Sequence, residues 1–178
     1  MHIYFATHST TKDNEARIAS GWKNVELSEL GIKQAKQLGS AFSGIKIDLI
    51  CTSDLIRAVD TVRIAFQDKI PVLIDKRLRE ANYGDFDGKK SEIVSAMKME
   101  CIKKPFKNGE SYEEAMARLH EFYNELKEKY KSPRDADVKI LVVGHRATQY
   151  GLDTMTGKTI EQCLTEPFKW QQYWEYEI

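Results

Sequence analysis

The sequence feature that most constrains the fold is the apolar run VKILVV at residues 138–143, which leads directly into Gly144 and His145. A short run that is rich in β-branched residues and closed by a glycine predicts a strand buried on both faces. Such strands belong mainly to parallel sheets with helices on either side. The chain is therefore expected to be an α/β protein built around a sheet of this kind.

Shorter strands and amphipathic helices alternate along the rest of the chain. Strands are predicted at 2–6, 48–52 and 72–74, and the alternating tail 170–178 predicts a last strand. Three helices are predicted in the first part of the chain: from a Ser28 cap to about Gly44, from a Ser53 or Asp54 cap through Phe66, and over 91–101. Three more follow: from a Ser111 and Glu114 capping box to about Tyr130, from about Ala147, and from a Thr159 and Gln162 capping box to Pro167. The first helix should bury its apolar positions, which are Ile32, Ala35, Leu38 and Phe42. We therefore predict a three-layer α/β/α sandwich with a mostly parallel central sheet, folded as a single domain over residues 1–178.

The composition argues against several classes of partner. The chain has 27 lysine and arginine residues together and 27 aspartate and glutamate residues together, so its formal net charge is zero. This balance favours neither nucleic acid nor an anionic membrane as a partner. The first apolar run, Ile3 to Ala6, is too short for a signal peptide or a membrane span. The three cysteines, Cys51, Cys101 and Cys163, form no CxxC pair and no disulfide framework. We expect a cytoplasmic protein with reduced thiols, either a monomer or a homodimer.

Three side chains with the chemistry of a phosphate pocket follow predicted strands. His8 follows the first predicted strand, and Arg57 lies in the first turn of the helix that follows the second strand. His145 follows the strand at 138–143, which has the clearest sequence signal. In α/β sheets, ligands bind at the carboxyl ends of the strands, where helix amino termini add N–H donors. The pattern alone leaves two interpretations open: one anion-binding site made by all three side chains, or histidines that serve only the structure.

Local motifs narrow this choice. They are the segments 7–14 (THSTTKDN), Arg17 with Gly21 and Trp22, 27–35 (LSELGIKQA), 53–61 (SDLIRAVDT), Leu78-Arg79-Glu80 with Gly84 and Gly88, and 143–145 (VGH). In this order they resemble the motifs of the histidine phosphatase (phosphoglycerate mutase-like) superfamily. The resemblance extends from Ile3 to the region of Thr156. It implies a phosphoglycerate mutase-like fold.

The resemblance also implies roles for single residues. His8 matches the nucleophile that takes up the phosphoryl group, while Arg57 and His145 match residues that bind its equatorial oxygens. Glu80 matches the acid that protonates the leaving alkoxide. Without the surrounding motif, Glu80 would be interpreted as an exposed loop carboxylate.

The nucleophile motif departs from the family pattern at its first residue. The family has arginine immediately before the nucleophile, whereas this chain has Thr7, with Ser9 in place of the following glycine. The missing guanidinium would give charge-assisted bonds to phosphate, so its loss puts activity on the usual substrates in question. Arg17 and Arg146 are candidates to supply that charge, and a place on the surface is the alternative for both.

Other residues give weaker signals. Asn14 and Thr11 match first-loop positions that line the family's pocket, and a turn or cap role is the alternative for each. Four lysines cluster before Gly109 and suggest either a basic lid over the site or a solvated helix face, of which the second is favoured. These lysines are Lys98, Lys103, Lys104 and Lys107.

The predicted activity is hydrolysis of a small phosphate monoester through a phosphohistidine on His8. No cofactor is expected, and no metal, because the cysteines and histidines have no ligand spacing. The expected partner is a small phosphorylated metabolite. One alternative is a phosphoglycerate mutase-type phosphotransferase. The other is a catalytically weakened member of the fold that binds a phosphorylated ligand or a protein, and Thr7 is the reason to consider it.

Overall fold

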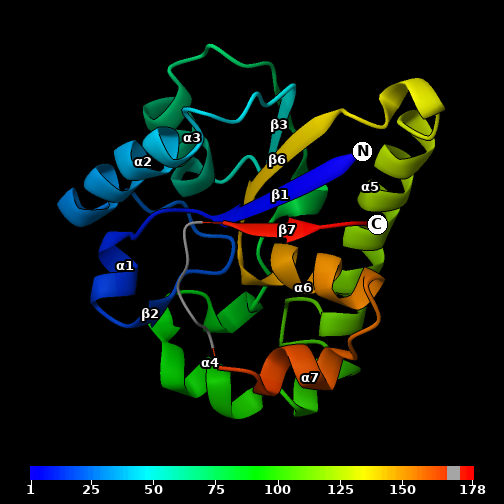
Figure 1. Cartoon of the computed structure of the whole chain (residues 1–178). Helices are drawn as coiled ribbons and strands as arrows, with labels where there is room; N and C mark the ends of the chain where they lie inside the picture. Colours follow the sequence, from blue (N-terminus) through cyan, green and yellow to red (C-terminus); the bar gives the residue numbers. More distant parts are fainter. Residues whose placement is uncertain (168–172) are drawn as a thin grey trace.

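The computed structural model describes residues 1–167 and 173–178, and its centre is a five-stranded sheet in the order β4-β3-β6-β1-β7 (Figure 1). The strands are β1 (His2–Thr7), β3 (Leu49–Thr52), β4 (Val72–Ile74), β6 (Lys139–Gly144) and β7 (Trp174–Tyr176). The first four run parallel, and β7 pairs antiparallel with β1. The predicted α/β fold with a mostly parallel sheet is therefore confirmed.

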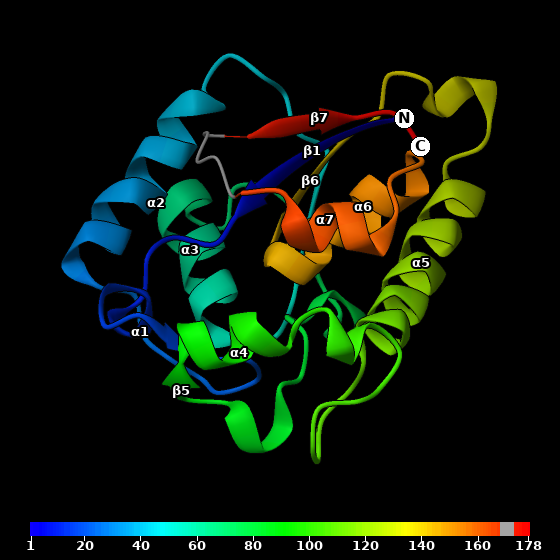
Figure 2. The same ribbon diagram turned by 90° about the horizontal axis from the view of Figure 1, so that it is seen from below.

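Helices cover both faces of this sheet (Figure 2). One face carries α2 (Glu29–Ala41) and α3 (Ile56–Phe66), and the other carries α5 (Tyr112–Lys129) and α6 (Arg146–Met155). Successive side chains of a strand point to opposite faces. In β6, Leu141 and Val143 accordingly join the core under α2 and α3, whereas Ile140 and Val142 join the core under α5 and α6. The run that predicted a strand buried on both faces is indeed buried on both.

The capping residues mark most helix starts correctly. The Ser28 side chain accepts from the Gly31 amide, and reciprocal capping boxes begin α5 at Ser111 and α7 (Ile160–Thr165) at Thr159. These side chains satisfy amides that have no partner within the helix.

Two details of the helix prediction are wrong. The cap of α3 is Leu55, without a side-chain hydrogen bond, so neither Ser53 nor Asp54 is its N-cap residue. The Ser53 hydroxyl instead contacts His145, because the strand end brings the two together. In α2, Ile32 is 40% exposed, while Ala35, Leu38 and Phe42 are buried as predicted. The apolar face of this helix is therefore narrower than the sequence pattern indicates.

Short elements that the sequence pattern missed lie at the carboxyl end of the sheet. They include α1 (Lys12–Glu15) and a two-stranded sheet of β2 (Ile18–Ala19) and β5 (Lys89–Lys90). The helix predicted over 91–101 is shorter, because α4 spans Ser91–Met97 and a 3-10 turn follows at Glu100–Ile102. Further 3-10 turns occur at Lys76–Leu78, Gly84–Phe86 and Pro133–Asp135. Of the strand predicted at 170–178, β7 forms the middle, and residues 170–172 lie outside the described part.

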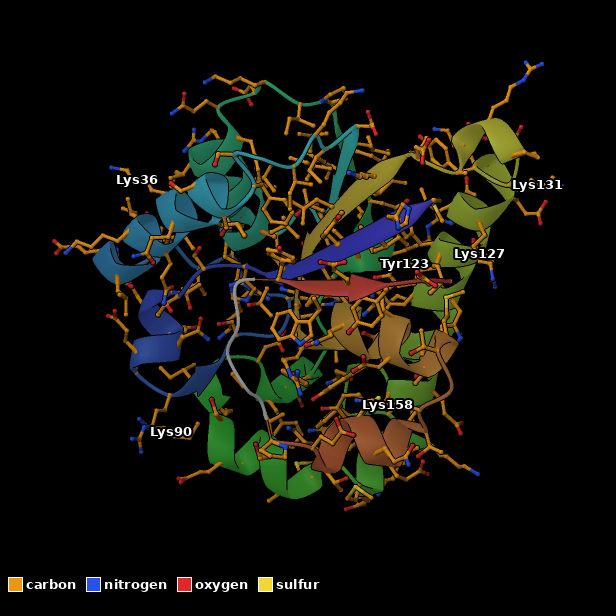
Figure 3. The ribbon with its side chains drawn as sticks, in the orientation of Figure 1. Lys36, Lys90, Tyr123, Lys127, Lys131 and Lys158 are labelled. Carbon is orange, nitrogen blue, oxygen red and sulfur yellow. The ribbon has the colours of Figure 1, made fainter. Side chains whose placement is uncertain are left out.

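The outer faces of the helices carry charged side chains (Figure 3). Lys36 on α2 and Lys127 on α5 point away from the body of the protein. Tyr123, on the same helix as Lys127, is buried, and its hydroxyl donates to the Thr148 carbonyl 3.0 Å away, which ties α5 to α6. Within the described ranges, no helix is both long enough and apolar enough to cross a membrane.

Candidate active site

The carboxyl ends of β1, β3 and β6 open into a cavity of about 790 Å³. Residues that directly follow strand ends line it: His8 after β1, and His145 between β6 and α6. Arg57, in the first turn of α3 after β3, also lines it. The structure therefore brings together the three cationic or imidazole side chains that the sequence predicts at one sheet edge.

The tautomer of His8 follows from its hydrogen bond. Its Nδ1 lies 2.8 Å from the Ser9 carbonyl oxygen, which can only accept, so Nδ1 carries the hydrogen and Nε2 keeps a lone pair. Burial, with a smaller contribution from the charge of Arg57, lowers the pKa of His8 to about 3. The imidazole is therefore neutral at neutral pH, as a nucleophile must be.

His145 is fully buried and is oriented by Ser53. Its Nε2 lies 2.7 Å from the Ser53 Oγ, which already accepts from the Leu55 amide at 3.3 Å. We assign the Ser53 hydroxyl as the donor to Nε2, which places the ring hydrogen on Nδ1. Burial and the charge of Arg57 hold the pKa of His145 well below its usual range, so the ring is neutral.

The free edge of His145 faces the same space as His8. The two ring centroids are 5.1 Å apart, with an angle of 54° between the planes. Among the described residues, Nδ1 of His145 has no hydrogen-bond partner although it is buried. A buried N–H without a partner is unfavourable. It is therefore suited to donate to a ligand oxygen that His8 also reaches.

The turn between β6 and α6 depends on a glycine. A Cβ on Gly144 would lie 2.6 Å from the Thr148 side chain. Two hydrogen bonds hold the Thr148 side chain next to Gly144. Its hydroxyl oxygen accepts from the His145 amide at 2.9 Å, and its hydroxyl donates to the Leu78 carbonyl at 2.8 Å. The close approach thus fixes the backbone that presents His145.

Arg57 is 2% exposed and its guanidinium is held by two backbone carbonyls. One terminal nitrogen donates to the carbonyl of Lys23 at 2.9 Å and the other to that of Gly21 at 2.7 Å. Burial lowers the pKa of Arg57, and the charge of Glu80 opposes that shift. These contacts fix the cation in one orientation and tie the loop around Trp22 to it.

Glu80 is a partly buried side chain at the cavity, which excludes the alternative of an exposed loop carboxylate. Its Oε1 accepts from the amide of Ala147 at 3.1 Å and its Oε2 from that of Arg146 at 3.2 Å, at the amino terminus of α6. Its own carbonyl accepts from the Trp22 indole at 2.6 Å and from Arg118 at 2.9 Å. Both the side chain and the backbone of Glu80 are thus held in place.

The other predicted site residues divide into two groups. Thr7, Asn14 and Arg146 line the cavity. Thr11 and Arg17 are not among the described residues that line it. Thr11 is the buried N-cap of α1, where its hydroxyl accepts from the Asn14 amide, and Arg17 is exposed at a positive φ of 55°. The local turn uses the Thr11 hydroxyl, and neither residue is placed at the cavity in the described part of the chain, so their role as phosphate ligands stays a prediction.

Arg146 reaches the cavity, and its side chain contacts other residues of α6. Its Nη1 donates to Gln149 at 2.7 Å, and its guanidinium lies 4.8 Å from the centroid of the Tyr150 ring. The side chain therefore runs along α6. Arg57, rather than Arg146, supplies the charge that lowers the pKa of both His8 and His145.

Several cavity residues were missed by sequence reasoning. They are Ser91 and Ser95 of α4, and the tyrosines Tyr83, Tyr112 and Tyr150. Lys98, the C-cap of α4, lines the cavity as well. Lys98 is partly buried, so a solvated helix face is the wrong interpretation for it, although Lys103, Lys104 and Lys107 are exposed as favoured. A signal was present, because Val94 is buried and a residue four positions later lies on the same face of a helix.

No cluster of three metal-binding side chains occurs within the described ranges, and the three cysteines are free and buried. The donors at the cavity are thus imidazoles, a guanidinium, hydroxyls and backbone amides. This set can bind a tetrahedral oxyanion and present one neutral imidazole to its central atom.

Comparison with known proteins assigns the family. The model of the histidine phosphatase superfamily (branch 1) matches residues 3–172. The chain belongs to this superfamily. A 2,3-bisphosphoglycerate-dependent phosphoglycerate mutase of Streptococcus uberis is 39% identical over 95 residues, which cover 50% of this chain and 41% of that enzyme. A phosphoglycerate mutase of Candida albicans is 38% identical over 101 residues, which cover 53% of this chain and 41% of that enzyme. The match therefore spans less than half the length of these relatives.

Solved histidine phosphatase structures share the fold over nearly the whole chain. The alpha-ribazole phosphatase of Shigella flexneri has a TM-score of 0.80 and 25% identity, covering 92% of this chain and 83% of that chain. A mycobacterial glucosyl-3-phosphoglycerate phosphatase, in a complex with VO3, has a TM-score of 0.73 and 26% identity, and the match covers 92% of this chain and 85% of that chain. YhfR of Bacillus stearothermophilus has a TM-score of 0.84 and covers 99% and 91%, and at 23% identity it shows the fold alone.

Proposed function

We propose that this histidine phosphatase superfamily member is a metal-independent phosphatase that hydrolyses a small phosphate monoester through a phosphohistidine on His8. The observation that carries the proposal is a neutral imidazole with a free Nε2 whose ring lies 5.1 Å from that of His145, beside the buried guanidinium of Arg57. A neutral nucleophile surrounded by fixed donors matches the needs of phosphoryl transfer.

The proposed reaction has two steps. In the first, the Nε2 of His8 attacks phosphorus, the bond from phosphorus to the ester oxygen breaks, and Glu80 gives a proton to the leaving alkoxide. In the second, water attacks the phosphorus of the phosphohistidine, the bond from phosphorus to Nε2 breaks and returns the lone pair to His8, Glu80 takes a proton from that water, and inorganic phosphate leaves. Arg57 and the Nδ1–H of His145 donate to the equatorial oxygens, where charge spreads in the transition state.

The test is phosphate release from p-nitrophenyl phosphate and from sugar phosphates. His8→Ala should lower kcat/KM by at least about 10⁴-fold, because the nucleophile is lost. His2→Ala is the matched control, because His2 is exposed at the start of β1. The phosphoenzyme should be trapped as an acid-labile adduct on His8 by mass spectrometry. Turnover that survives in His8→Ala would refute the proposal.

A second candidate is a phosphotransferase of the mutase type, which the names of the relatives favour. Such an enzyme would interconvert phosphoglycerates only in the presence of a bisphosphate primer. Absence of primer-dependent turnover of 3-phosphoglycerate would remove this candidate. A third candidate, a weakened member that binds a phosphorylated ligand or a protein without turnover, is favoured only by Thr7 and is removed by strong wild-type hydrolysis.

We place the enzyme in the cytoplasm as part of the same proposal. The support is that all three cysteines are buried and unpaired, which suits a reducing compartment. Whether it is a monomer or a homodimer stays a prediction, which sedimentation would decide.

A further inference from the structure

The segment that carries Glu80 belongs to no helix or strand. Residues 79–83 lie between the 3-10 turns Lys76–Leu78 and Gly84–Phe86. Backbone groups outside helices and strands still need hydrogen-bond partners wherever they are shielded from water. The residues that supply these partners therefore decide where the Glu80 carboxylate can lie.

Arg118 on α5 supplies most of the partners. Its Nη1 donates to the carbonyls of Arg77 at 2.6 Å and of Arg79 at 2.9 Å, and its Nη2 donates to that of Glu80 at 2.9 Å. The other two N–H groups bind the carboxylate of Glu110, from Nε at 3.0 Å and from Nη2 at 2.6 Å. All five donors of the guanidinium are thus used. A lysine has three donors and no planar fork, so it cannot make the same set of bonds.

Glu110 holds the same loop on the other side of Glu80. Its Oε1 also accepts from the Asn82 amide at 2.8 Å, and its own amide donates to the Asn82 carbonyl at 3.0 Å. The side chains of Arg118 and Glu110 are only 17% and 15% exposed, so water and salt screen this ion pair less than a pair on the surface. The pair therefore fixes the backbone both before and after Glu80.

The Arg118–Glu110 pair does not reach the reacting groups. Neither residue is among the described residues that line the cavity, whereas Glu80 is. The pair contacts the backbone of the loop, and the Glu80 carboxylate contacts the amides of Arg146 and Ala147 at the start of α6. Any effect of the pair on the reaction must therefore pass through the position of the loop.

We propose that Arg118 and Glu110 are positioning residues that set the place of the Glu80 carboxylate for proton transfer. The inference rests on the proposed phosphatase function and adds the remote residues that make the acid effective. A general acid must come within about 2.6–3.2 Å of the leaving oxygen, and a misplacement of about 1 Å can cost about 10²-fold in rate. A loosened loop should therefore slow only those esters whose leaving group needs a proton.

The test compares n-propyl phosphate, whose alkoxide needs a proton, with p-nitrophenyl phosphate, whose leaving group does not. Arg118→Lys keeps the charge and loses the fork, so kcat on n-propyl phosphate should fall about 10- to 10²-fold. On p-nitrophenyl phosphate the fall should stay below about threefold, and KM should change little on both esters, because the pair does not contact the substrate. Glu110→Gln should change kcat in the same pattern to a smaller extent, because it keeps an oxygen that can accept.

Arg63→Lys is the matched control, and it should leave kcat on both esters unchanged. Arg63 is also a helix arginine paired with one carboxylate, that of Asp60, but it is exposed on α3. In a Glu80→Gln background, Arg118→Lys should add no further loss on n-propyl phosphate, because no acid is left to position. Equal losses on the two esters, or a full further loss in that background, would overturn the positioning role and leave the proposed function intact.

An inactive wild type would give a different result. If neither ester is hydrolysed, the proposed function fails, and amide hydrogen exchange decides whether the pair positions the loop. Faster exchange over residues 79–83 in Arg118→Lys, but not in Arg63→Lys, would support it. Unchanged exchange in Arg118→Lys would overturn it.

Discussion

The two ends of the cavity are built in different ways. At the inner end, around His8, Arg57 and His145, backbone carbonyls or a buried hydroxyl hold every one of these side chains. At the outer wall, formed by Ser91, Ser95, Lys98 and Arg146, Lys98 takes part in no ion pair found in the described ranges. Fixed donors suit a reaction whose transition state always has the same shape, whereas a less constrained wall suits recognition of one particular substrate.

Glu80 also lines the cavity, and after the loss of His8 its replacement gives the largest expected effect. Glu80→Gln removes the proposed proton donor, so kcat/KM on an alkyl phosphate should fall about 10²- to 10⁴-fold. On p-nitrophenyl phosphate the fall should be much smaller, because that leaving group needs no proton. Steady-state assays on both esters measure the difference, with exposed Glu100→Gln as the control. Equal losses on the two esters would assign Glu80 to the structure of the inner end rather than to proton transfer.

Thr7 gives the next largest effect and tests how complete the inner end is. Thr7→Arg places a guanidinium at the end of β1, where Thr7 lines the cavity. The gain should be about 10²- to 10³-fold in kcat, or about 2–4 kcal/mol, by analogy with the loss of one oxyanion donor. A variant that gains nothing would show that the inner end already binds the phosphoryl group fully without this arginine.

Measured over a single pH unit, the pH dependence of folding gives the smallest effect. The pKa of His8 is lowered in the folded protein to about 3, so below about pH 6.5 the unfolded chain binds more protons than the folded chain. The free energy of unfolding should then decrease as the pH falls from about 6.5 towards 3, by about 1.4 kcal/mol per pH unit for this imidazole.

Urea titrations between about pH 4.5 and 6.5 measure that slope. His8→Asn should reduce it by about the contribution of one imidazole, and His2→Ala, at an exposed position, should leave it unchanged. An unchanged slope in His8→Asn would mean that the inner end does not hold His8 neutral.

The inner end was largely predictable from the sequence because its residues follow strand ends at fixed positions. The buried run before Gly144 predicted the central strand, and the helix caps at Ser28, Ser111 and Thr159 were read correctly. These features are local, so periodicity and capping rules detect them. Whether residues 1–178 fold as a single domain stays a prediction.

The outer wall could not be predicted in the same way because it depends on packing between distant segments. α4 lines the cavity because of tertiary packing, which the sequence of this helix alone does not predict. From the sequence, Lys98 looked like one member of an exposed lysine cluster. Ser53 or Asp54 was expected to cap α3, but β6 pairs with β3, and the Ser53 hydroxyl therefore contacts His145 instead. In both cases a tertiary contact overrode a local preference.

The two carbonyls that hold Arg57 also restrict how this enzyme can evolve. A lysine would keep the positive charge, but a single ammonium cannot reproduce a planar group that spans the Gly21 and Lys23 carbonyls while facing a ligand. A drift from arginine to lysine, harmless at many surface positions, would here loosen the loop that carries Trp22 and with it the backbone of Glu80. If Arg57 binds the phosphoryl group as proposed, selection on this one position acts on anion binding and on loop order together, and lysine should not occur there in lineages that keep the activity.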